Sequence, residues 1–175
     1  ALNATAVLAA VHQLGLDVEA AANALVEFRG SDRRFDILGT FNGVTLVDDY
    51  AHHPTEISAT LHAARQHFPK AKIWSVWQPH TYSRTTTLLD DFVISFSDAD
   101  VVLVTDVYAA REKNDDFSGQ QLADQIKHDH VHFTPELNDA IKHLHKNVRP
   151  GDVVIVCSAG SAIAINQELS KKLQS

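Results

Sequence analysis

The sequence predicts an α/β protein whose mostly parallel sheet carries helices on both faces and a β-hairpin at its N-terminal end, preceded by a helical hairpin. Three observations support this fold class. Apolar segments of strand length alternate with helical segments from residue 44 onward, as in parallel sheets that are covered on both faces. An Asn-Gly dipeptide separates two extended segments, and the first thirty residues show helical spacing only.

The N-terminal segment predicts two helices. Apolar side chains recur at helical spacing at Leu2, Ala6, Ala9, Ala10 and Leu14. Gly15 then ends the first helix, and Asp17 can cap a second helix that ends near Gly30. We therefore expect a first domain segment over residues 1–30, a helical hairpin, and a second domain over residues 31–175.

The second domain is expected to begin with a β-hairpin. Residues 33–41 and 44–49 read as strands on either side of Asn42-Gly43, the dipeptide that best tolerates the two positive φ angles of a tight hairpin turn. Helices and strands then alternate, and the right-handed crossover rule places helices on both faces. The expected helices are 54–67, 83–97, 118–128, 135–146 and 161–172, and the expected strands are 72–77, 101–104, 131–133 and 153–157.

Composition excludes several classes of protein. The single Cys157 rules out an internal disulfide and a multi-thiolate zinc site. A formal charge of −7 has the wrong sign for nucleic acid or anionic membranes, so small molecules are the expected partners. We expect a cytoplasmic protein, because we find neither an apolar run of membrane-spanning length nor a basic-flanked signal segment. The chain contains no methionine and starts within a helical pattern, so we expect it to be a piece of a longer protein.

The first expected strand end carries an unusually polar segment, DDYAHHP, residues 48–54. Ligands of open α/β sheets bind at the carboxyl ends of the strands, so five polar side chains here favour a functional site. The alternative is a solvated helix entry, in which Pro54 occupies the first turn and an acid caps the helix.

The second strand end, QPHTYSRT at residues 78–85, offers His80, Tyr82 and Arg84. An arginine can hold a carboxylate or phosphate through two hydrogen bonds, so these residues could form a binding pocket. The alternative is an ordinary loop with Ser83 as a helix cap.

The remaining strand ends give weaker signals. Asp106 and Tyr108 follow the strand 101–104, where a structural role explains them equally well. The turn CSAGSA could hold an anion through backbone amides, but the chain has no nucleotide-binding glycine loop. The eleven histidines do not assemble into a closed set of ligands, so no metal site is expected.

Three segments together resemble one protein family. They are RRFDILGTFNGVTLVDDYAHHPTEI, WQPHTYSRTTTLLDDF and LVTDVYAARE. In order and spacing they are similar to the C-terminal part of the alanine-adding members of the Mur ligase family, and the similarity extends from Ala1 to about Arg111. It implies that the helical start is the end of the family's central ATPase domain and that the rest is its C-terminal Rossmann-like domain.

The resemblance also implies a reaction. In these cytoplasmic ligases of peptidoglycan biosynthesis, ATP phosphorylates the carboxylate of UDP-N-acetylmuramate, and the amine of L-alanine attacks the acyl phosphate to give an amide. The implied cofactors are ATP and magnesium. The family's P-loop and magnesium ligands lie in the central domain and the UDP-sugar site lies in the N-terminal domain. This chain would therefore contribute only part of an active site, would depend on those domains as partners, and would be inactive alone.

Site residues are implied by their positions in the motifs. Arg34 is the implied phosphate contact and Asp49 the implied ribose contact. The implied amino-acid and reaction pocket contains Tyr50, His52, His80, Tyr82 and Arg84. Arg84 could hold the alanine carboxylate, and His52 could position or deprotonate the amine. Arg34, His52 and His80 are the implied catalytic residues, and no metal ligand is implied.

Two departures from the family pattern are visible. Thr81 stands where many members have arginine, so alanine recognition is expected to depend more on Arg84. The turn SAGSAIAIN replaces a GAGDI-like turn near the C-terminus.

Other functions remain open on the sequence alone. A related ligase, which reattaches recycled murein tripeptide, shares the DD-aromatic-AHHP motif, but the SRT that follows Tyr82 argues against it. A stand-alone nucleotide-binding or dehydrogenase-like domain is disfavoured because no dinucleotide glycine fingerprint follows any strand. A non-catalytic interaction module would need an exposed apolar patch, which a sequence does not display.

Overall fold

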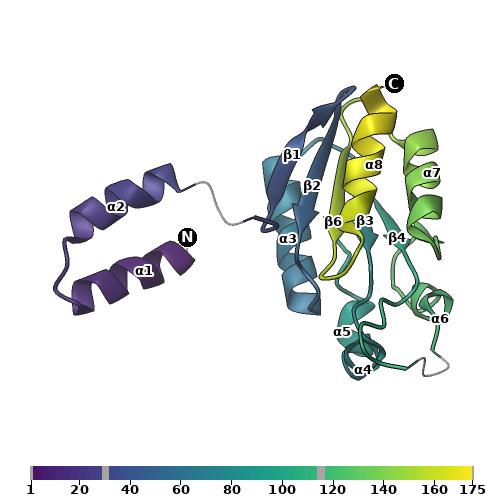
Figure 1. Cartoon of the computed structure of the whole chain (residues 1–175), viewed down its shortest axis with the longest axis horizontal. Helices are drawn as coiled ribbons and strands as arrows, with labels where there is room; N and C mark the ends of the chain where they lie inside the picture. Colours follow the sequence, from purple (N-terminus) through teal and green to yellow (C-terminus); the bar gives the residue numbers. More distant parts are fainter. Residues whose placement is uncertain (1, 29–31, 114–116, 175) are drawn as a thin grey trace. The chain divides into compact units, whose positions relative to one another are not determined.

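A computed structural model describes residues 2–28, 32–113 and 117–174 (Figure 1). The chain divides into two compact units, Ala1–Ser31 and Asp32–Ser175. In the described ranges, no helix combines the length and apolar character that crossing a lipid bilayer requires.

The first unit is a helical hairpin, as predicted. It consists of α1 (Leu2–Gln13) and α2 (Val18–Glu27). Gly15 adopts a φ of 68°, and the Asp17 carboxylate caps α2 by accepting a hydrogen bond from the Ala20 amide at 3.0 Å. The helix ends at Glu27, and Gly30, where the sequence predicted its end, lies outside the described residues.

The second unit is built on a six-stranded sheet with the order β1-β2-β6-β3-β4-β5 (Figure 1). Its strands are β1 (Asp36–Phe41), β2 (Val44–Asp49), β3 (Ile73–Trp77), β4 (Val101–Val104), β5 (Val131–Phe133) and β6 (Val153–Cys157). Only the β1–β2 pair is antiparallel among the described strand pairs. The predicted fold class, a mostly parallel Rossmann-like sheet with an N-terminal β-hairpin, is therefore confirmed.

The hairpin turn has the predicted geometry. Asn42 and Gly43 have φ values of 48° and 79°, and Phe41 pairs directly with Val44. Asn and Gly are the residues that enter this conformation at lowest cost, so the dipeptide fixes the register of the hairpin.

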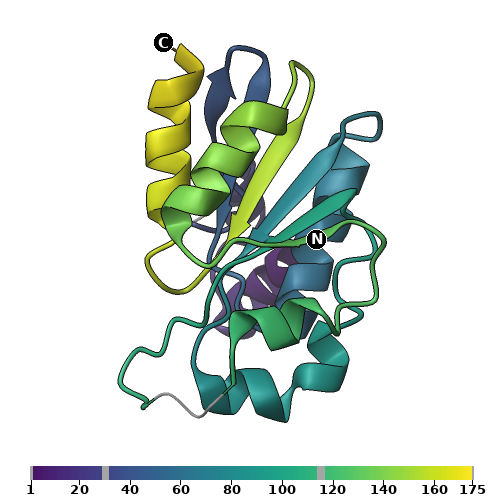
Figure 2. The same ribbon diagram turned by 90° about the vertical axis from the view of Figure 1, so that its right-hand side faces the viewer.

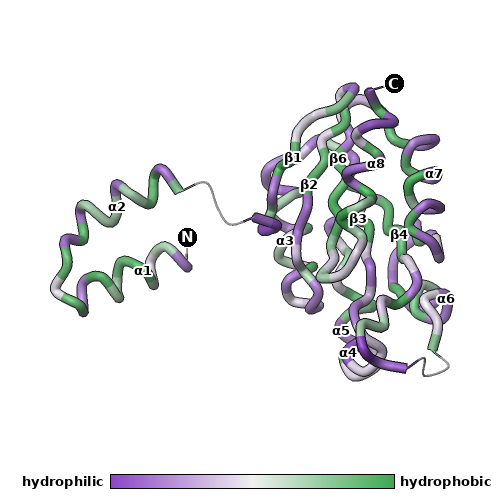
Figure 3. The backbone as a smooth tube through the Cα atoms, in the orientation of Figure 1, coloured by the Kyte–Doolittle hydropathy of each residue, from purple (hydrophilic) through white to green (hydrophobic). Residues whose placement is uncertain are grey.

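Helices cover both faces of the sheet, which explains why the central strands are largely apolar (Figures 2 and 3). One core contains side chains of α3 (Pro54–His67), α5 (Leu89–Phe92) and α6 (Gly119–Ala123). The other contains side chains of α7 (Leu137–Asn147) and α8 (Ile163–Gln174). Every residue of β3, β4 and β6 is buried between them.

The expected helix over 83–97 was wrong in its extent. It is interrupted and forms α4 (Tyr82–Thr87) and α5, followed by turns. The hydroxyls of Thr85 and Thr86 donate to the carbonyls of Thr81 and Tyr82, at 2.7 and 3.0 Å. Such bonds back to the preceding turn bend and weaken a helix, and α4 ends at Thr87.

The expected helix over 118–128 is also shorter than predicted. Ser118 caps α6, which ends at Ala123. The amide of Lys127 donates to the carbonyl of Val93 at 2.8 Å, instead of to the carbonyl four residues earlier as it would in a continuing helix. Helices α3, α7 and α8 agree with the sequence to within two residues at each end.

Candidate functional site

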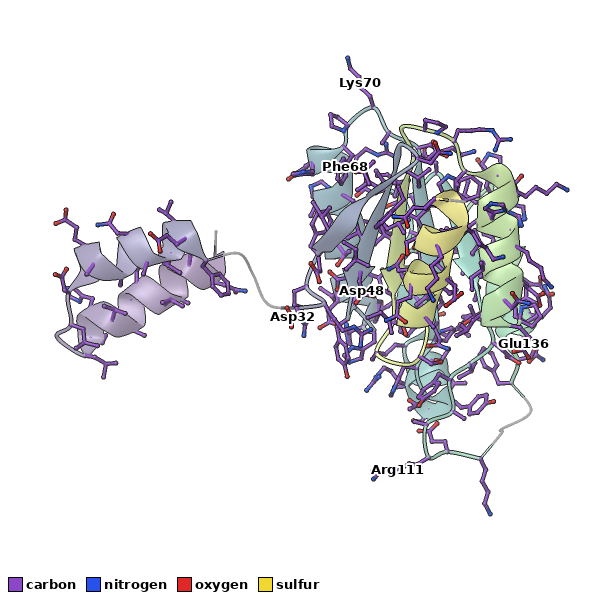
Figure 4. All side chains as sticks on the ribbon, turned by 45° about the horizontal axis from the view of Figure 1, so that its top comes forward. Asp32, Asp48, Phe68, Lys70, Arg111 and Glu136 are labelled. Carbon is purple, nitrogen blue, oxygen red and sulfur yellow. The ribbon has the colours of Figure 1, made fainter. Side chains whose placement is uncertain are left out.

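The polar segments singled out in the sequence meet at one edge of the sheet, which we call the C-terminal edge. The ends of β2, β6, β3 and β4 are in register, because Asp49 pairs with Cys157, Cys157 with Trp77, and Trp77 with Val104. Figure 4 shows the two ends of the sheet, with Lys70 beyond one and Arg111, which follows β4, beyond the other. Segments that are far apart in the sequence therefore form one surface, where ligands bind in open α/β sheets.

Asp49 is the buried centre of the first polar segment. One carboxylate oxygen accepts hydrogen bonds from the Phe35 amide at 2.8 Å and the Thr60 hydroxyl at 3.1 Å, and the other accepts from the Ala51 amide at 2.8 Å. A carboxylate has about four acceptor positions, so about one remains for a further donor. Asp49 therefore has a structural role, because it bonds the segments around the end of β2 together.

The same segment also starts α3. His53 is the N-cap, and its ring accepts from the Thr55 amide at 3.3 Å, while Glu56 accepts from the amides of His52 and His53 at 3.0 and 3.2 Å. Burial opposes ionisation of Glu56, but these hydrogen bonds outweigh it and lower the pKa of Glu56. The helix-entry alternative thus explains His53 and Pro54, but it does not require the side chains of Tyr50 and His52.

Four rings form a row along the C-terminal edge. Ring centres of Tyr50 and His52 are 5.2 Å apart, those of His52 and His80 are 6.1 Å apart, and those of His80 and Tyr108 are 5.5 Å apart. The row connects the loops after β2, β3 and β4. It brings His52 and His80, predicted from two separate motifs, next to each other.

The two histidines present different nitrogens. His52 Nδ1 lies 2.9 Å from the Tyr50 carbonyl oxygen and 3.5 Å from a Glu56 oxygen, both acceptors, so Nδ1 carries the hydrogen and Nε2 of the neutral ring is a proton acceptor. His80 Nδ1 lies 3.2 Å from Arg84 Nη1, which can only donate, so the neutral His80 ring carries its hydrogen on Nε2. One ring is therefore arranged to accept a proton and the other to donate a hydrogen bond.

His80 is held in its neutral form. Burial is the largest cause of the lowered pKa of His80, and the positive charge of Arg84 lowers it further. A neutral ring beside Arg84 keeps the guanidinium free to bind an anion.

Arg34 lies at the opposite end of the row. Its guanidinium is half exposed, lies 5.7 Å from the centre of the Tyr50 ring, and approaches a Glu56 oxygen at 3.5 Å. Since Glu56 also contacts His52, one carboxylate connects the predicted phosphate contact to the predicted proton acceptor.

The loop after β3 differs in part from the prediction. Ser83 does not cap α4, whose N-cap is Thr81 at a φ of 67°; instead Ser83 donates from its amide and hydroxyl to Glu112, at 3.0 and 2.5 Å. These bonds lower the pKa of Glu112. Tyr82, predicted to bind substrate, is only 8% exposed, so most of its surface is used in packing.

The turn after β6 is held by a residue that sequence analysis did not single out. Gln78 accepts hydrogen bonds from the Ser158 hydroxyl at 2.8 Å and the Ala162 amide at 3.0 Å, and donates to the Ser161 hydroxyl at 3.2 Å. A side chain at Gly160 would place Cβ 2.6 Å from Gln78 Oε1 and 2.9 Å from the Tyr108 ring. The small residues of this turn therefore serve close packing against the ring row.

Comparison with known proteins assigns the family. The family described as "Mur ligase, glutamate ligase domain" matches residues 33–160, which include all the strand ends described above. The chain belongs to the Mur ligase family. Two curated relatives are UDP-N-acetylmuramate–L-alanine ligases: one from Agathobacter rectalis is 45% identical over 97% of this chain, and one from Caldanaerobacter subterraneus subsp. tengcongensis is 43% identical over 95%.

This Mur ligase chain covers only 38% of the length of the Agathobacter rectalis relative and 36% of the length of the Caldanaerobacter subterraneus one. Among solved structures, the UDP-N-acetylmuramate–alanine ligase of Thermotoga maritima matches 99% of the chain, and 37% of its own, at 31% identity with a TM-score of 0.82. A murein peptide ligase of Psychrobacter arcticus matches 99%, and 36% of its own chain, at 27% identity with a TM-score of 0.70. The sequence identity and the TM-score are both higher for the alanine ligase than for the murein peptide ligase.

Within this Mur ligase fold, the structure brings together most of the predicted site residues: Arg34, Tyr50, His52, His80 and Arg84. Their individual roles stay predictions. Sequence analysis missed Arg33, Glu56, Gln78 and Glu112. Only Glu56 had a local signal, because it stands three residues after the N-cap, but the cap is a histidine instead of the usual serine or threonine. In the described part of the chain, no three His, Cys, Asp or Glu side chains are grouped to hold a metal ion.

Proposed function

We propose that this chain is the C-terminal portion of a cytoplasmic, ATP-dependent ligase that joins L-alanine to UDP-N-acetylmuramate in peptidoglycan biosynthesis. In this proposal residues 1–30 end the central ATPase domain, and residues 31–175 form the C-terminal domain. The UDP-sugar site, the P-loop and the magnesium ligands belong to the N-terminal and central domains. The chain alone is therefore inactive.

The observation that carries the proposal is the ring row with two arginines beside it, Arg34 next to Tyr50 and Arg84 next to His80. It places Arg84 and His80 on one side of His52, and Tyr50 and Arg34 on the other. A reaction between an amino acid and a phosphorylated carboxylate needs an anion contact for each reactant and a proton acceptor between them. The names of the relatives, which are alanine ligases, agree with this arrangement.

Alanine is proposed to bind beside Arg84 and His80. The guanidinium would hold the amino-acid carboxylate, and the Nε2 hydrogen of His80 would donate to the same group or to the reacting carbonyl oxygen. Alanine enters with an ammonium group, which has no lone pair and does not attack a carbonyl carbon. Because Nε2 of neutral His52 is unprotonated, His52 is the residue proposed to take up the ammonium proton.

The nucleotide is proposed to lie at the Arg34 end. Arg34 is exposed enough to reach a phosphate, and it would offset negative charge that develops there. The acceptor position that remains on Asp49 fits a ribose hydroxyl, which is a hydrogen-bond donor. Magnesium, held by ligands outside this chain, would neutralise the phosphate charge.

The test uses the full-length protein that contains this chain and measures ADP release with UDP-N-acetylmuramate and either L-alanine or the murein tripeptide. We expect turnover with L-alanine, and a rise of at least an order of magnitude in the KM for L-alanine in Arg84→Ala. Turnover with tripeptide alone would replace this function by that of the recycling ligase.

A second measurement tests whether the isolated chain is self-sufficient. Calorimetric titration of the 175-residue chain with AMPPNP and magnesium, with and without L-alanine, is expected to give no binding or millimolar binding. Micromolar binding by the chain alone would contradict the proposal that absent domains complete the site.

A further inference from the structure

The segment that carries Arg34 is folded back tightly onto the end of β2. The amide of Tyr50 donates to the Arg33 carbonyl at 2.7 Å, and the amide of Phe35 donates to Asp49 at 2.8 Å. Arg33 and Phe35 have φ values of 59° and 49°, a left-handed conformation that side chains other than glycine, asparagine and aspartate adopt at a cost of about 1–2 kcal/mol. Arg34 is thus held between two strained residues.

Arg33 fastens this segment to two strand ends. Its Nε donates to Asp48 Oδ2 at 2.8 Å, and its Nη2 donates to the Ser158 carbonyl at 2.7 Å, so one guanidinium connects the ends of β2 and β6. The same guanidinium lies 5.0 Å from the centre of the Tyr50 ring, the ring over which Arg34 also lies. Arg33 is therefore bonded to the strand ends, whereas the Arg34 side chain is half exposed.

The Arg33–Asp48 ion pair is not well arranged to stabilise the fold. Asp48 is fully buried, and among the described residues its Oδ1 has no hydrogen-bond partner. Burial raises the pKa of Asp48 in spite of the hydrogen bond and the charge of Arg33. Taking two charges out of water is expensive, and replacing a buried ion pair by neutral groups is often neutral or stabilising. Persistence of this pair beside strained backbone suggests a positional role.

We propose that Arg33 is a positioning residue that, through Asp48 and the Ser158 carbonyl, holds residues 33–35 in their strained conformation and so presents Arg34 to the nucleotide. The inference rests on the proposed function, since it takes Arg34 as a phosphate contact. In this proposal Arg33 acts through Arg34 and does not itself bind a reactant.

The chain provides a matched control. Arg65 is a second partly buried arginine, with 30% of its side chain exposed against 26% for Arg33. It also donates to a carbonyl, that of Ala71 at 2.8 Å, and to a carboxylate, that of Asp100 at 2.7 Å. Because these contacts lie at the opposite edge of the sheet, Arg65→Lys should change the Tm without changing the KM for ATP.

The first experiment measures steady-state kinetics and thermal unfolding of full-length Arg33→Met, Asp48→Asn, Arg33→Met/Asp48→Asn and Arg65→Lys. Arg33→Met leaves a buried carboxylate unpaired, so its Tm falls at neutral pH, and the double variant recovers most of that loss. We expect the KM for ATP to stay raised, on the order of 10-fold, in both Arg33 variants, because Arg34 is no longer held in place. A double variant with recovered Tm and a wild-type KM for ATP would overturn the proposal.

A second variant covers the case in which Arg33→Met does not fold. Arg33→Lys keeps the charge, but an ammonium group cannot make both contacts of the planar guanidinium. In the 175-residue chain, we expect the Phe35 amide to exchange hydrogen faster in Arg33→Lys than in the wild type, while exchange of the Ile73 amide, which is bonded to Asp100, is unchanged. Unchanged exchange at Phe35 would count against the proposal.

The two failures can be told apart. If the full-length wild type shows no turnover that depends on ATP and L-alanine, the proposed function fails, and the exchange experiment alone decides whether Arg33 holds the segment. If turnover is present but every Arg33 variant keeps the wild-type KM for ATP, the positioning role fails and the ligase function stands.

Discussion

The two edges of the sheet each contain an arginine–aspartate pair, and the pairs differ in how completely they are satisfied. At the N-terminal edge, one oxygen of Asp100 accepts from both Arg65 and the Ile73 amide, at 2.7 Å each. Burial opposes ionisation there, but these bonds outweigh it and lower the pKa of Asp100. At the C-terminal edge, burial prevails and raises the pKa of Asp48. The first pair is optimised for stability and the second is not.

Backbone conformation shows the same difference. At the N-terminal edge, positive φ angles fall on Asn42, Gly43 and Gly151, residue types that tolerate them. At the C-terminal edge they fall on residues that do not: Arg33, Phe35, Thr81 and Ala110. Strain of this kind concentrates where side chains must be aimed at a ligand. We infer that the C-terminal edge gives up stability for the position of its side chains, and the following substitutions test this.

His52→Ala in the full-length protein should have the largest effect. Loss of a positioned proton acceptor is expected to lower kcat on the order of 10²- to 10⁴-fold, while the free energy of unfolding changes by about 0.5 kcal/mol or less. His62→Ala is the control, because His62 is another α3 histidine that pairs with an acid, Asp98, away from the ring row. If His52→Ala and His62→Ala had the same kcat, His52 would not be the proton acceptor.

The glycines at the two edges give the next largest contrast. Gly160→Ala would drive Cβ into Gln78 and Tyr108, so we expect a loss of about 1–3 kcal/mol and a displaced ring row. Gly151→Ala meets nothing within 4 Å, and only its φ of 96° is unfavourable. Chemical denaturation measures both losses. Only Gly160→Ala should also raise the KM for L-alanine, and a rise of the same size in Gly151→Ala would contradict the division between the edges.

Asp100→Asn should affect stability alone, by about 1 kcal/mol, since the pair is partly exposed. The lowered pKa of Asp100 means that its contribution is present above the unfolded value of about 3.9 and is lost as the pH falls through the folded value. The difference in unfolding free energy between wild type and variant should therefore be constant near neutral pH and shrink below about pH 4. If the difference in unfolding free energy grew as the pH fell, the pKa of Asp100 would be raised by folding and not lowered.

The sequence predicted the sheet well because its signals are local. Each buried strand is a short apolar run, and the strand bounds expected over 101–104, 131–133 and 153–157 agree with the structure. Helix ends were harder, since the interruption after Thr87 depends on hydroxyl groups that bond to the backbone. A pattern of apolar residues does not report that competition.

The site was predicted in part for the same reason. Residues on strand ends, such as His52 and His80, could be found because the fold class brings such ends together. Arg33 and Gln78 could not, because their partners Ser158 and Ala162 lie about 80 or more positions away in the chain. Asp49 shows the opposite case: its motif was conspicuous, but its hydrogen bonds to Phe35 before β1, to Ala51 in the loop and to Thr60 in α3 appear only in three dimensions.

The smallest expected effect compares two histidines whose pKa is lowered. Burial is the largest cause for both His80 and His143, and each has a charged neighbour as the next cause, Arg84 for His80 and His132 for His143. His143 lines a hollow near the N-terminal edge. Arg84→Gln removes the neighbour of His80 only, so the pKa of His80 should rise while that of His143 is unchanged. NMR titration of the 175-residue chain measures both rings at once.

The rise should be incomplete, because Arg84→Gln leaves the His80 ring as buried as before, and burial continues to favour the neutral form. A lowered histidine pKa makes the folded chain lose stability as the pH falls below about 6.5, so the variant should lose less than the wild type over that range. Return of the His80 pKa to its ordinary value would mean that the Arg84 charge, and not burial, keeps this ring neutral. The C-terminal edge would then owe its neutral histidine to one removable charge, and binding of an anion to Arg84 would itself promote protonation of His80.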